Sequence, residues 1–225
     1  MVDLALVGLR AADLLATLDD AEQSVAARFV RPGDRSRYEA AHVGLRVVLA
    51  ACGRTGMAAV SVARAACGRC GAPHGKPVLP DRPDVGFSLA HAGSVALVAV
   101  AAVPVGVDLE PVDGRSVANL VRSICTSGEV RALEAAGAPP ARVLRVWTRK
   151  EALLKATGAG LTRDPTTVEV GLGGAATVEG FRVTDVDVPV AGYVAAAAWE
   201  GSAPRRVRLG AVIVEERQPL CVLHG

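Results

Sequence analysis

Hydrophobic and polar residues follow two different periods along the chain, which separates helical segments from extended ones. Residues 10–30 and 38–53 carry apolar side chains at three- and four-residue intervals, which predicts two helices. The second helix is expected to end near Gly53, as helices commonly do at glycine. Turn-forming residues at 31–37 predict a break between the two helices, and the Gly- and Pro-rich segment 67–84 predicts a loop.

The rest of the chain predicts strands in both halves and further helices in the second half. A helix is expected near 116–136, where Thr126 and Glu129 fit a capping box, and the clearest helix lies at 142–158. Strands are expected at 1–10, 85–93, 94–102, 105–111, 166–172, 176–183, 192–200 and 205–216. The pattern predicts an α+β protein with two similar halves, 1–104 and 105–225, each a short antiparallel sheet packed with helices, and an active site in the cleft between them.

The strand VGVDLEP, residues 105–111, has two different faces. Its apolar residues alternate with Gly106, Asp108 and Glu110, so two carboxylates lie on one face. One interpretation is an edge strand that shows this polar face to water. The other is that a cation lies between the carboxylates, because two close carboxylates otherwise repel, and oxygen ligands suit Mg²⁺ or Mn²⁺. Only a third ligand and a substrate site can decide between them.

A third carboxylate occurs in the helix that contains VWTRKEALLK. Spacings of three and four residues place a group of side chains on one helix face: Trp147, Lys150, Glu151 and Leu154. Glu151 and Lys155 are also four residues apart, which fits an ordinary surface pair worth ~0.2–0.5 kcal/mol. The tryptophan at the head of this face indicates instead that it is partly buried.

Composition excludes several classes of protein. The 225 residues are 51% hydrophobic but only 3% aromatic, and the net charge of +2 gives no field that would select nucleic acid or an anionic membrane. The longest apolar run, 95–107, is interrupted by Pro104 and is shorter than the ~20 residues of a membrane span. Five cysteines and no basic cluster before the first apolar segment predict a cytoplasmic protein in a reducing compartment.

Three potential metal ligands stand close together in the loop CGRCGAPH. Cys67 and Cys70 form a C-x-x-C pair, and His74 follows. This is half of a zinc site, and no second C-x-x-C pair exists in the sequence. We therefore expect loop thiols here rather than a structural zinc site, which elemental analysis would decide.

Two segments together closely resemble the signature of the 4′-phosphopantetheinyl transferases. VGVDLE matches the family's G-[VI]-D-x-E, and WTRKEALLK matches its W-[ST]-x-K-E-x-x-x-K, followed by GAGL for G-x-G-L. Further similarity covers HGKPVLPD (74–81), GFSLAHAG (86–93) and the arginine-rich segment with the first long helix (28–50). The length resembles the surfactin-synthetase-activating type, a single chain of two similar halves, rather than the short trimeric holo-acyl-carrier-protein synthase type.

The resemblance implies an enzyme, a holo-[acyl-carrier-protein] synthase or 4′-phosphopantetheinyl transferase. Its substrates would be coenzyme A and a serine of an acyl or peptidyl carrier protein, and it would release adenosine 3′,5′-bisphosphate. In the second half, Asp108, Glu110 and Glu151 would hold Mg²⁺, with Mn²⁺ as a substitute, against the pyrophosphate of coenzyme A. Glu151 or a water that it orients would take the serine proton, Lys155 would stabilise the departing nucleotide, and Lys150 would support the motif.

By the same resemblance, the first half supplies the contacts to the nucleotide end of coenzyme A. Candidate contacts in this half are Arg31, Arg46, Lys76, Ser88 and His91, with Arg35 and His42 as further partners for the 3′-phosphate. Lys155 of the second half is a further candidate contact to coenzyme A. The alternatives are a core histidine for His91 and a solvated helix charge for Arg46. Ala90 and Ala92 flank His91 where the family commonly has serines, so a hydroxyl contact is lost or comes from the backbone or Ser88.

Two other functions remain open at this stage. The chain could be a non-catalytic module that binds coenzyme A or a carrier protein, although such a module would not need three convergent acids. It could also be an unrelated Mg²⁺-dependent phosphohydrolase, which would need a second acidic cluster or an activating histidine. We expect a monomer with no nucleic-acid or membrane partner; the carrier could serve fatty acid, polyketide or nonribosomal peptide synthesis.

Overall fold

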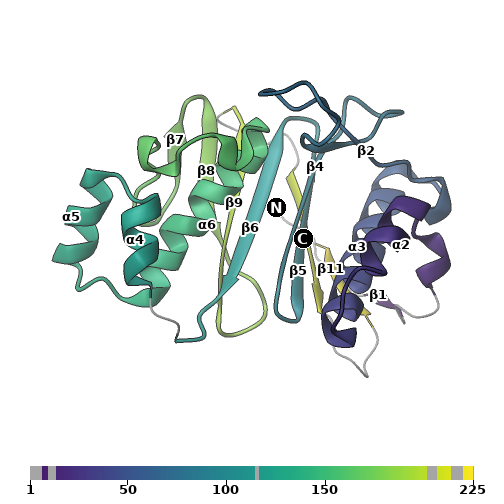
Figure 1. Cartoon of the computed structure of the whole chain (residues 1–225), viewed down its shortest axis with the longest axis horizontal. Coiled ribbons are helices and arrows are strands. Elements are labelled where there is room, and N and C mark those ends of the chain that lie inside the picture. Colours follow the sequence, from purple (N-terminus) through teal and green to yellow (C-terminus); the bar gives the residue numbers. More distant parts are fainter. Residues whose placement is uncertain (1–6, 10–13, 115–116, 202–206, 214–219, 225) are drawn as a thin grey trace.

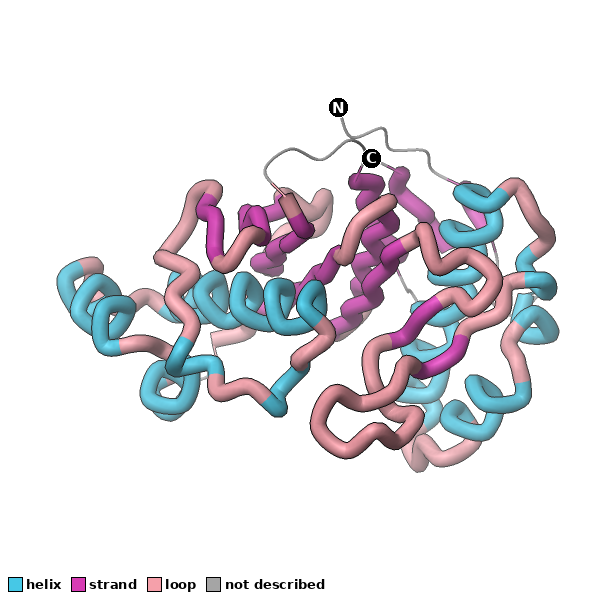
Figure 2. The backbone as a smooth tube through the Cα atoms, turned by 90° about the horizontal axis from the view of Figure 1, so that it is seen from above, coloured by secondary structure: helices cyan, strands magenta, loops and turns pink. Residues whose placement is uncertain are grey.

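The elements form four layers in the order helix, sheet, sheet, helix (Figure 1). The computed structural model describes residues 7–9, 14–114, 117–201, 207–213 and 220–224. Seen from above, the strands lie together in the middle and the helices lie on both outer sides (Figure 2). The predicted α+β class is confirmed in its content of helices and antiparallel sheets.

The helical elements lie in two groups along the chain. Those before the first long strands are η1 (Leu15–Thr17), α2 (Asp20–Ala26), α3 (Pro32–Gly53) and η2 (Met57–Ala59). Those of the second group are α4 (Ala118–Ile124), α5 (Ser127–Ala135), α6 (Pro140–Thr157), η3 (Gly160–Thr162) and η4 (Pro165–Thr167). Residues 10–13 of the first expected helix lie outside the described part of the chain.

The strands of the described residues lie in three antiparallel sheets. The first sheet has the order β1 (Val7–Leu9), β11 (Leu220–His224), β10 (Val207–Ile213), β5 (Val95–Ala101) and β4 (Gly86–Ala92). The second has the order β6 (Val105–Pro111), β9 (Tyr193–Glu200), β8 (Phe181–Val186) and β7 (Ala176–Val178). A small hairpin pairs β2 (Ala63–Arg64) with β3 (Pro77–Val78).

The last two strands return to the first sheet, which the sequence pattern did not predict. β10 pairs with β5 along its whole length, from Val207 opposite Ala101 to Ile213 opposite Val95. The expected division places the C-terminal strands in the second half, 105–225, because they follow it in sequence. Apolar periodicity identifies a strand but not its partner, and the free edge of β5 provides the partner here.

Small side chains fill the space between the two large sheets. Alanine and valine residues of β5, β6 and β9 make up much of this inner core, for example Ala99, Val107 and Ala197, all of which are fully buried. α3 packs on the outer face of the first sheet and α6 on the outer face of the second. The high Ala and Val content of the chain therefore reflects two sheets that pack closely face to face.

Local signals explain where the helices begin and end. α3 begins at Pro32, so the expected break at 31–37 is wrong; proline is well suited to the first helical turn, where its missing N–H costs nothing. The helix ends after Gly53 with Arg54 in the left-handed region. The expected helix at 116–136 is two helices, because the Thr126–Glu129 capping box starts α5.

Two strand predictions in the second half also need correction. Residues 166–172 contain the end of η4 and irregular chain rather than a strand. The expected strand 176–183 is a hairpin, β7 and β8, which turns at Glu179 and Gly180 with φ of 52° and 84°. Among the described residues, no helix has both the length and the apolar character that crossing a membrane requires.

Candidate active site

The site is built where α6 packs on β6. A Cβ added to Gly106 would lie 2.0 Å from the carbonyl oxygen of Ala152, so only glycine allows the helix this close to the strand. Gly106 shares its face of β6 with Asp108 and Glu110, which therefore also face α6. This close packing places the two carboxylates of VGVDLEP beside the motif residues of the helix.

Hydrogen bonds from α6 reach both acids of the strand. Lys155 Nζ donates to Asp108 Oδ1 at 2.6 Å, and Trp147 Nε1 donates to Glu110 Oε1 at 3.2 Å. Asp108 is 7% exposed, so the polar face of β6 is not the solvated edge that the simpler interpretation required. The structure thus brings Asp108, Glu110, Glu151 and Lys155 into one electrostatic group.

Two carboxylate oxygens of this group are buried without a hydrogen-bond partner among the described residues. They are Asp108 Oδ2 and Glu151 Oε1. A buried carboxylate oxygen normally accepts at least one hydrogen bond, because its loss of hydration is costly. Two such oxygens in one group therefore indicate a place that a cation or a donor can fill.

Burial and mutual repulsion change the acidity of these carboxylates. Burial raises the pKa of Asp108 to about 7, against the opposing effect of Lys155, and the charges of Glu151 and Glu110 raise it further. Burial likewise raises the pKa of Glu151, again opposed by Lys155 and increased by Glu110. The group holds more negative charge than one lysine balances.

The donor set fits a hard divalent cation such as Mg²⁺ or Mn²⁺. All three acids offer oxygen ligands, and two of those oxygens are unpartnered. The described carboxylates do not, however, bring three ligand atoms within 4.8 Å of one another, and the ammonium of Lys155 contacts Asp108 instead. A cation at Asp108 Oδ1 would therefore have to displace Lys155, whereas Asp108 Oδ2 has no hydrogen-bond partner in the described structure.

A large cavity of about 990 Å³ opens next to this group. Its lining comes from both sides of the position 104/105: α2, α3, the β2–β3 hairpin and β4 on one side, and the end of α6 on the other. Lys155 belongs to the lining and also pairs with Asp108, so it stands between the cavity and the carboxylates. A polar ligand in this cavity would reach the acids at Lys155.

Several of the residues expected to bind coenzyme A line the cavity. They are His42, Lys76, Ser88, His91 and Lys155. Lys76 donates to the carbonyl oxygens of Val105 and Ala156 at 2.8 and 3.2 Å, and burial lowers its pKa to about 8. Surrounding protein atoms, followed by the nearby charges of His42 and Lys155, lower the pKa of His91. These groups contribute basic side chains to the cavity lining.

Ser88 also joins the two sheets. Its Oγ accepts a hydrogen bond from the backbone N–H of Val107 at 3.1 Å, which links β4 to β6. The hydroxyl keeps its own proton for donation toward the cavity. One side chain therefore holds the strand of Asp108 in place and contributes to the cavity wall.

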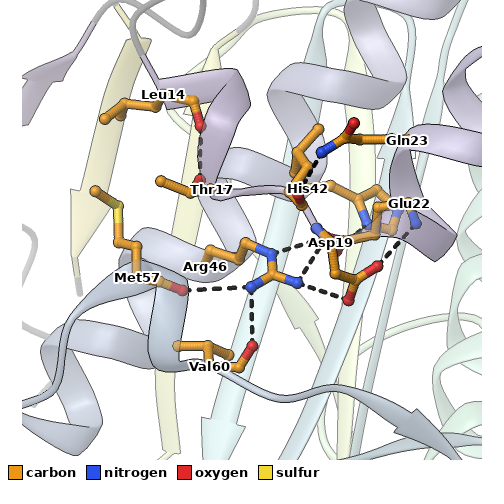
Figure 3. Close-up of polar contacts among 10 residues, drawn as sticks. Leu14, Thr17, Asp19, Glu22, Gln23, His42, Arg46, Met57 and Val60 are labelled. Carbon is orange, nitrogen blue, oxygen red and sulfur yellow. Dashed lines mark hydrogen bonds and ion pairs between the residues drawn. The ribbon is translucent and has the colours of Figure 1, made fainter.

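Arg46 is not placed to bind a ligand, which corrects our expectation. It is 1% exposed and lies outside the cavity lining. Figure 3 shows its polar contacts. Its guanidinium donates to Asp19, Glu22 and the carbonyl oxygens of Met57 and Val60. It is not a solvated charge either, because it ties α2 and η2 to α3 with every guanidinium nitrogen in use.

The other two arginine candidates lie away from the cavity. Arg31 is exposed at the N-cap of α3 and is not part of the lining that the structure describes. Arg35 is also outside this lining and pairs with Glu39. His42 does line the cavity, where its Nδ1 lies 3.0 Å from Glu22 Oε1.

Sequence reasoning missed the buried ion pairs that hold α6. Lys150 is fully buried and contacts Glu129 Oε2 at 2.7 Å, as well as the carbonyl oxygens of Pro165 and Val168. Arg149, also fully buried, donates to the carbonyl oxygen of Val170 and to Asp185. The capping-box pattern predicted a role for Glu129 at the start of a helix. No sequence pattern predicts that Glu129 also pairs with Lys150.

Comparison with known proteins agrees with these features. Residues 104–198 match the sequence profile of the 4′-phosphopantetheinyl transferase superfamily. The chain is 32% identical over 91 residues to the 4′-phosphopantetheinyl transferase psf-1 of Bacillus pumilus, covering 40% of this chain and 39% of that protein. It is 31% identical over 153 residues to slr0495 of Synechocystis sp., provisionally named a 4′-phosphopantetheinyl transferase, covering 65% and 59% of the two chains.

The matched segment contains β6, α6 and β9, which form the packing that carries the acids. In this segment the chain is similar to the 4′-phosphopantetheinyl transferase superfamily. The alignments span roughly two fifths and three fifths of the two curated relatives.

Proposed function

We propose that this chain transfers the 4′-phosphopantetheine arm of coenzyme A to a serine hydroxyl of a carrier protein and releases adenosine 3′,5′-bisphosphate. The observation that carries the proposal is the position of Lys155, which lines the 990 Å³ cavity and contacts Asp108 beside two unpartnered carboxylate oxygens. A cavity lined by basic side chains next to an acidic group suits a substrate that brings phosphates toward a divalent cation.

Asp108, Glu110 and Glu151 are the residues that would hold Mg²⁺, or Mn²⁺ in its place. When bound, the ion would neutralise charge on the pyrophosphate and favour in-line attack on the phosphorus. Lys155 would then release Asp108 and contact a phosphate oxygen, which keeps the positive charge of the lysine beside the departing nucleotide.

Glu151 is proposed to accept the serine proton, directly or through a water. Burial and the neighbouring Glu110 raise its pKa, and a carboxylate with a raised pKa is a stronger base than an exposed one. Its unpartnered Oε1 is an oxygen available for that proton or for the ion.

Lys76, His91 and the hydroxyl of Ser88 are proposed to orient coenzyme A along the cavity. Lys76 lies two residues beyond His74 in the cavity-lining loop, and its ammonium bridges the start of β6 and the end of α6. A phosphate bound to Lys76 would lie near the start of β6 and the end of α6. We also propose that the chain acts as a monomer of the surfactin-synthetase-activating type, with two similar halves and its active site between them.

The decisive experiment measures transfer directly. Purified chain, coenzyme A, Mg²⁺ and apo carrier proteins from fatty acid, polyketide and nonribosomal peptide synthesis are incubated and analysed by intact mass. We expect a gain of one phosphopantetheine group on at least one carrier, and no gain without Mg²⁺. Unchanged mass on all carriers would overturn the proposal. Binding of coenzyme A without transfer would indicate a binding module, and hydrolysis of coenzyme A without transfer would indicate a phosphohydrolase.

The three carboxylates can be separated by their dependence on Mg²⁺. Asp108→Ala and Glu110→Ala remove proposed ligands, so raising Mg²⁺ or substituting Mn²⁺ should partly restore transfer. Glu151→Gln keeps one ligating oxygen but loses basicity, and extra metal should restore it less. Asp84→Asn, on an exposed loop, is the matched control. Near-parental activity of Glu151→Gln at high Mg²⁺ would show that Glu151 is only a ligand.

A further inference from the structure

Cys67, Cys70 and His74 form a cluster outside the acidic site. One ligand atom from each, two sulfurs and an imidazole nitrogen, lie within 4.8 Å of one another. Cys70 Sγ is 3.0 Å from His74 Nε2. The atoms of a tetrahedral zinc site, with Zn–S of about 2.3 Å and Zn–N of about 2.0–2.1 Å, are about 3.5–3.8 Å apart. The cluster is therefore close to the size that zinc requires.

The backbone of the loop fixes these ligands before any metal binds. Cys67 N–H donates to Ala72 O and Gly71 N–H donates to Cys67 O, both at 2.8 Å, and Gly71 has a φ of +75° that favours glycine. The loop stands on the β2–β3 hairpin, where Ala65 N–H donates to Lys76 O at 3.0 Å. Such a turn brings both thiols and the imidazole to one side without further folding.

The donor atoms of the cluster are two cysteine sulfurs and one imidazole nitrogen. Cysteine binds a metal as its thiolate. Two thiolates and an imidazole are soft or borderline donors, which favour zinc over Mg²⁺ or Ca²⁺.

We propose that Cys67, Cys70 and His74 bind one zinc ion. Binding would release the two thiol protons to solvent and would leave one coordination position for water, because the described residues supply three ligands to this cluster. Cys67 and Cys70 are free cysteines in the structure, so both sulfurs are available as ligands. Zinc is thus distinct from the ion proposed at the carboxylates, in donor set and in place.

A zinc ion in this cluster would affect the cavity, because the cluster lies in the same loop as Lys76. Cys67 and His74 line the same cavity as Lys76, which lies two residues after His74. A zinc ion would tie both ends of the turn together and so limit the movement of Lys76 relative to β6 and α6. This consequence, unlike the site itself, rests on the proposed function, and predicts that zinc removal raises the KM for coenzyme A more than it lowers kcat.

The site is tested without coenzyme A. The chain is stripped by chelator under reducing conditions, incubated with Zn²⁺ and desalted, and its metal is measured by elemental analysis. We expect one zinc per chain, and at least about tenfold weaker binding in Cys67→Ser, Cys70→Ser and His74→Ala. Cys52→Ser, a cysteine outside the cluster, is the control. Less than about 0.1 zinc per chain in the parental protein, or an equal loss in Cys52→Ser, would overturn the proposal.

Cobalt substitution provides a second measurement that needs no variant. Co²⁺ in a tetrahedral site with thiolate ligands shows sulfur-to-metal charge-transfer bands and intense visible bands. Their appearance with parental chain at one equivalent supports the cluster as a metal site. A purely octahedral spectrum, or a Cys67–Cys70 disulfide in the reduced and metal-supplied protein, would contradict it. Neither result depends on transfer activity, so failure of this proposal and failure of the proposed function are distinguishable.

Discussion

Two buried groups of charges, both anchored on helices, differ in how completely their charges are paired. In the first, Arg46 uses all of its guanidinium nitrogens for Asp19, Glu22 and two carbonyl oxygens. Burial alone would raise the pKa of Glu22, but hydrogen bonds from His42 and Arg46 outweigh it and hold that pKa below its ordinary value. In the second, Lys155 faces three acids, and two carboxylate oxygens have no partner in the described structure.

The difference separates a structural network from a binding site. A closed network stabilises the fold and has nothing left to offer a ligand. An incomplete one costs stability in the free protein and recovers it when a cation or a substrate group completes it. On this basis Arg46 belongs to the fold, whereas Asp108 and Glu151 carry the unpartnered oxygens of the proposed site.

The largest expected effect is on catalysis, through the incomplete network. We expect Glu151→Gln to lower the rate of carrier modification by about 10²–10⁴-fold, the usual contribution of a general base. Its melting temperature should not fall, because the variant removes one of the crowded negative charges. Intact-mass kinetics and thermal unfolding measure the two effects. Glu179→Gln is the control, because Glu179 pairs with Arg163 at the surface. A large loss of stability in Glu151→Gln would show that Glu151 serves the fold rather than catalysis.

The next effect is on folding, through the closed network. Arg46→Met leaves Glu22 and Asp19 without their cation and should lower the free energy of unfolding by about 3–5 kcal/mol. Chemical denaturation measures this change. Adding Glu22→Gln to Arg46→Met should recover part of the loss, because the stranded charge is then removed. If Arg46→Met kept its stability but no longer bound coenzyme A, Arg46 would be a ligand-binding residue rather than a structural one.

A third effect depends on pH. The pKa of Asp108 is about 7 in the folded chain and near 3.8 when exposed, so the folded state holds an extra proton between these values. Stability from this group is therefore present at low pH and is lost as pH rises toward 7, by roughly 1.4 kcal/mol per unit at most. In metal-free protein, Asp108→Asn should remove this slope. Parallel stability curves for the two proteins between pH 5 and 7 would be evidence against the raised pKa.

The smallest expected effect is on stability, through the hydrogen bond of Ser88 that links β4 of the first sheet to β6 of the second. Ser88→Ala leaves the buried N–H of Val107 without an acceptor, and we expect a loss of about 1–2 kcal/mol in unfolding free energy. Ser88→Thr keeps the hydroxyl and serves as the comparison. If Ser88→Ala changed the KM for coenzyme A and left stability intact, the hydroxyl would act on the ligand alone.

The sequence was informative where the signal is local. The period-two pattern of 105–111 and the helical spacing of Trp147, Glu151 and Lys155 predicted the strand and the helix of the site, because both patterns follow from backbone geometry. It could not predict that Arg46 meets Glu22 or that Lys150 meets Glu129, since these pairs form only after the elements pack. The partner of β10 was missed for the same reason.

The return of the chain to the first sheet has a consequence for synthesis. During translation β5 emerges with one apolar edge open, and it stays open until Val207–Ile213 has left the ribosome. The sheet beside the cavity can therefore close only when nearly the whole polypeptide has been made. Residues 104–198, which match the superfamily profile, include almost all of the second sheet but not β10. A nascent chain that ends there carries the acids and the motif helix next to an unfinished first sheet.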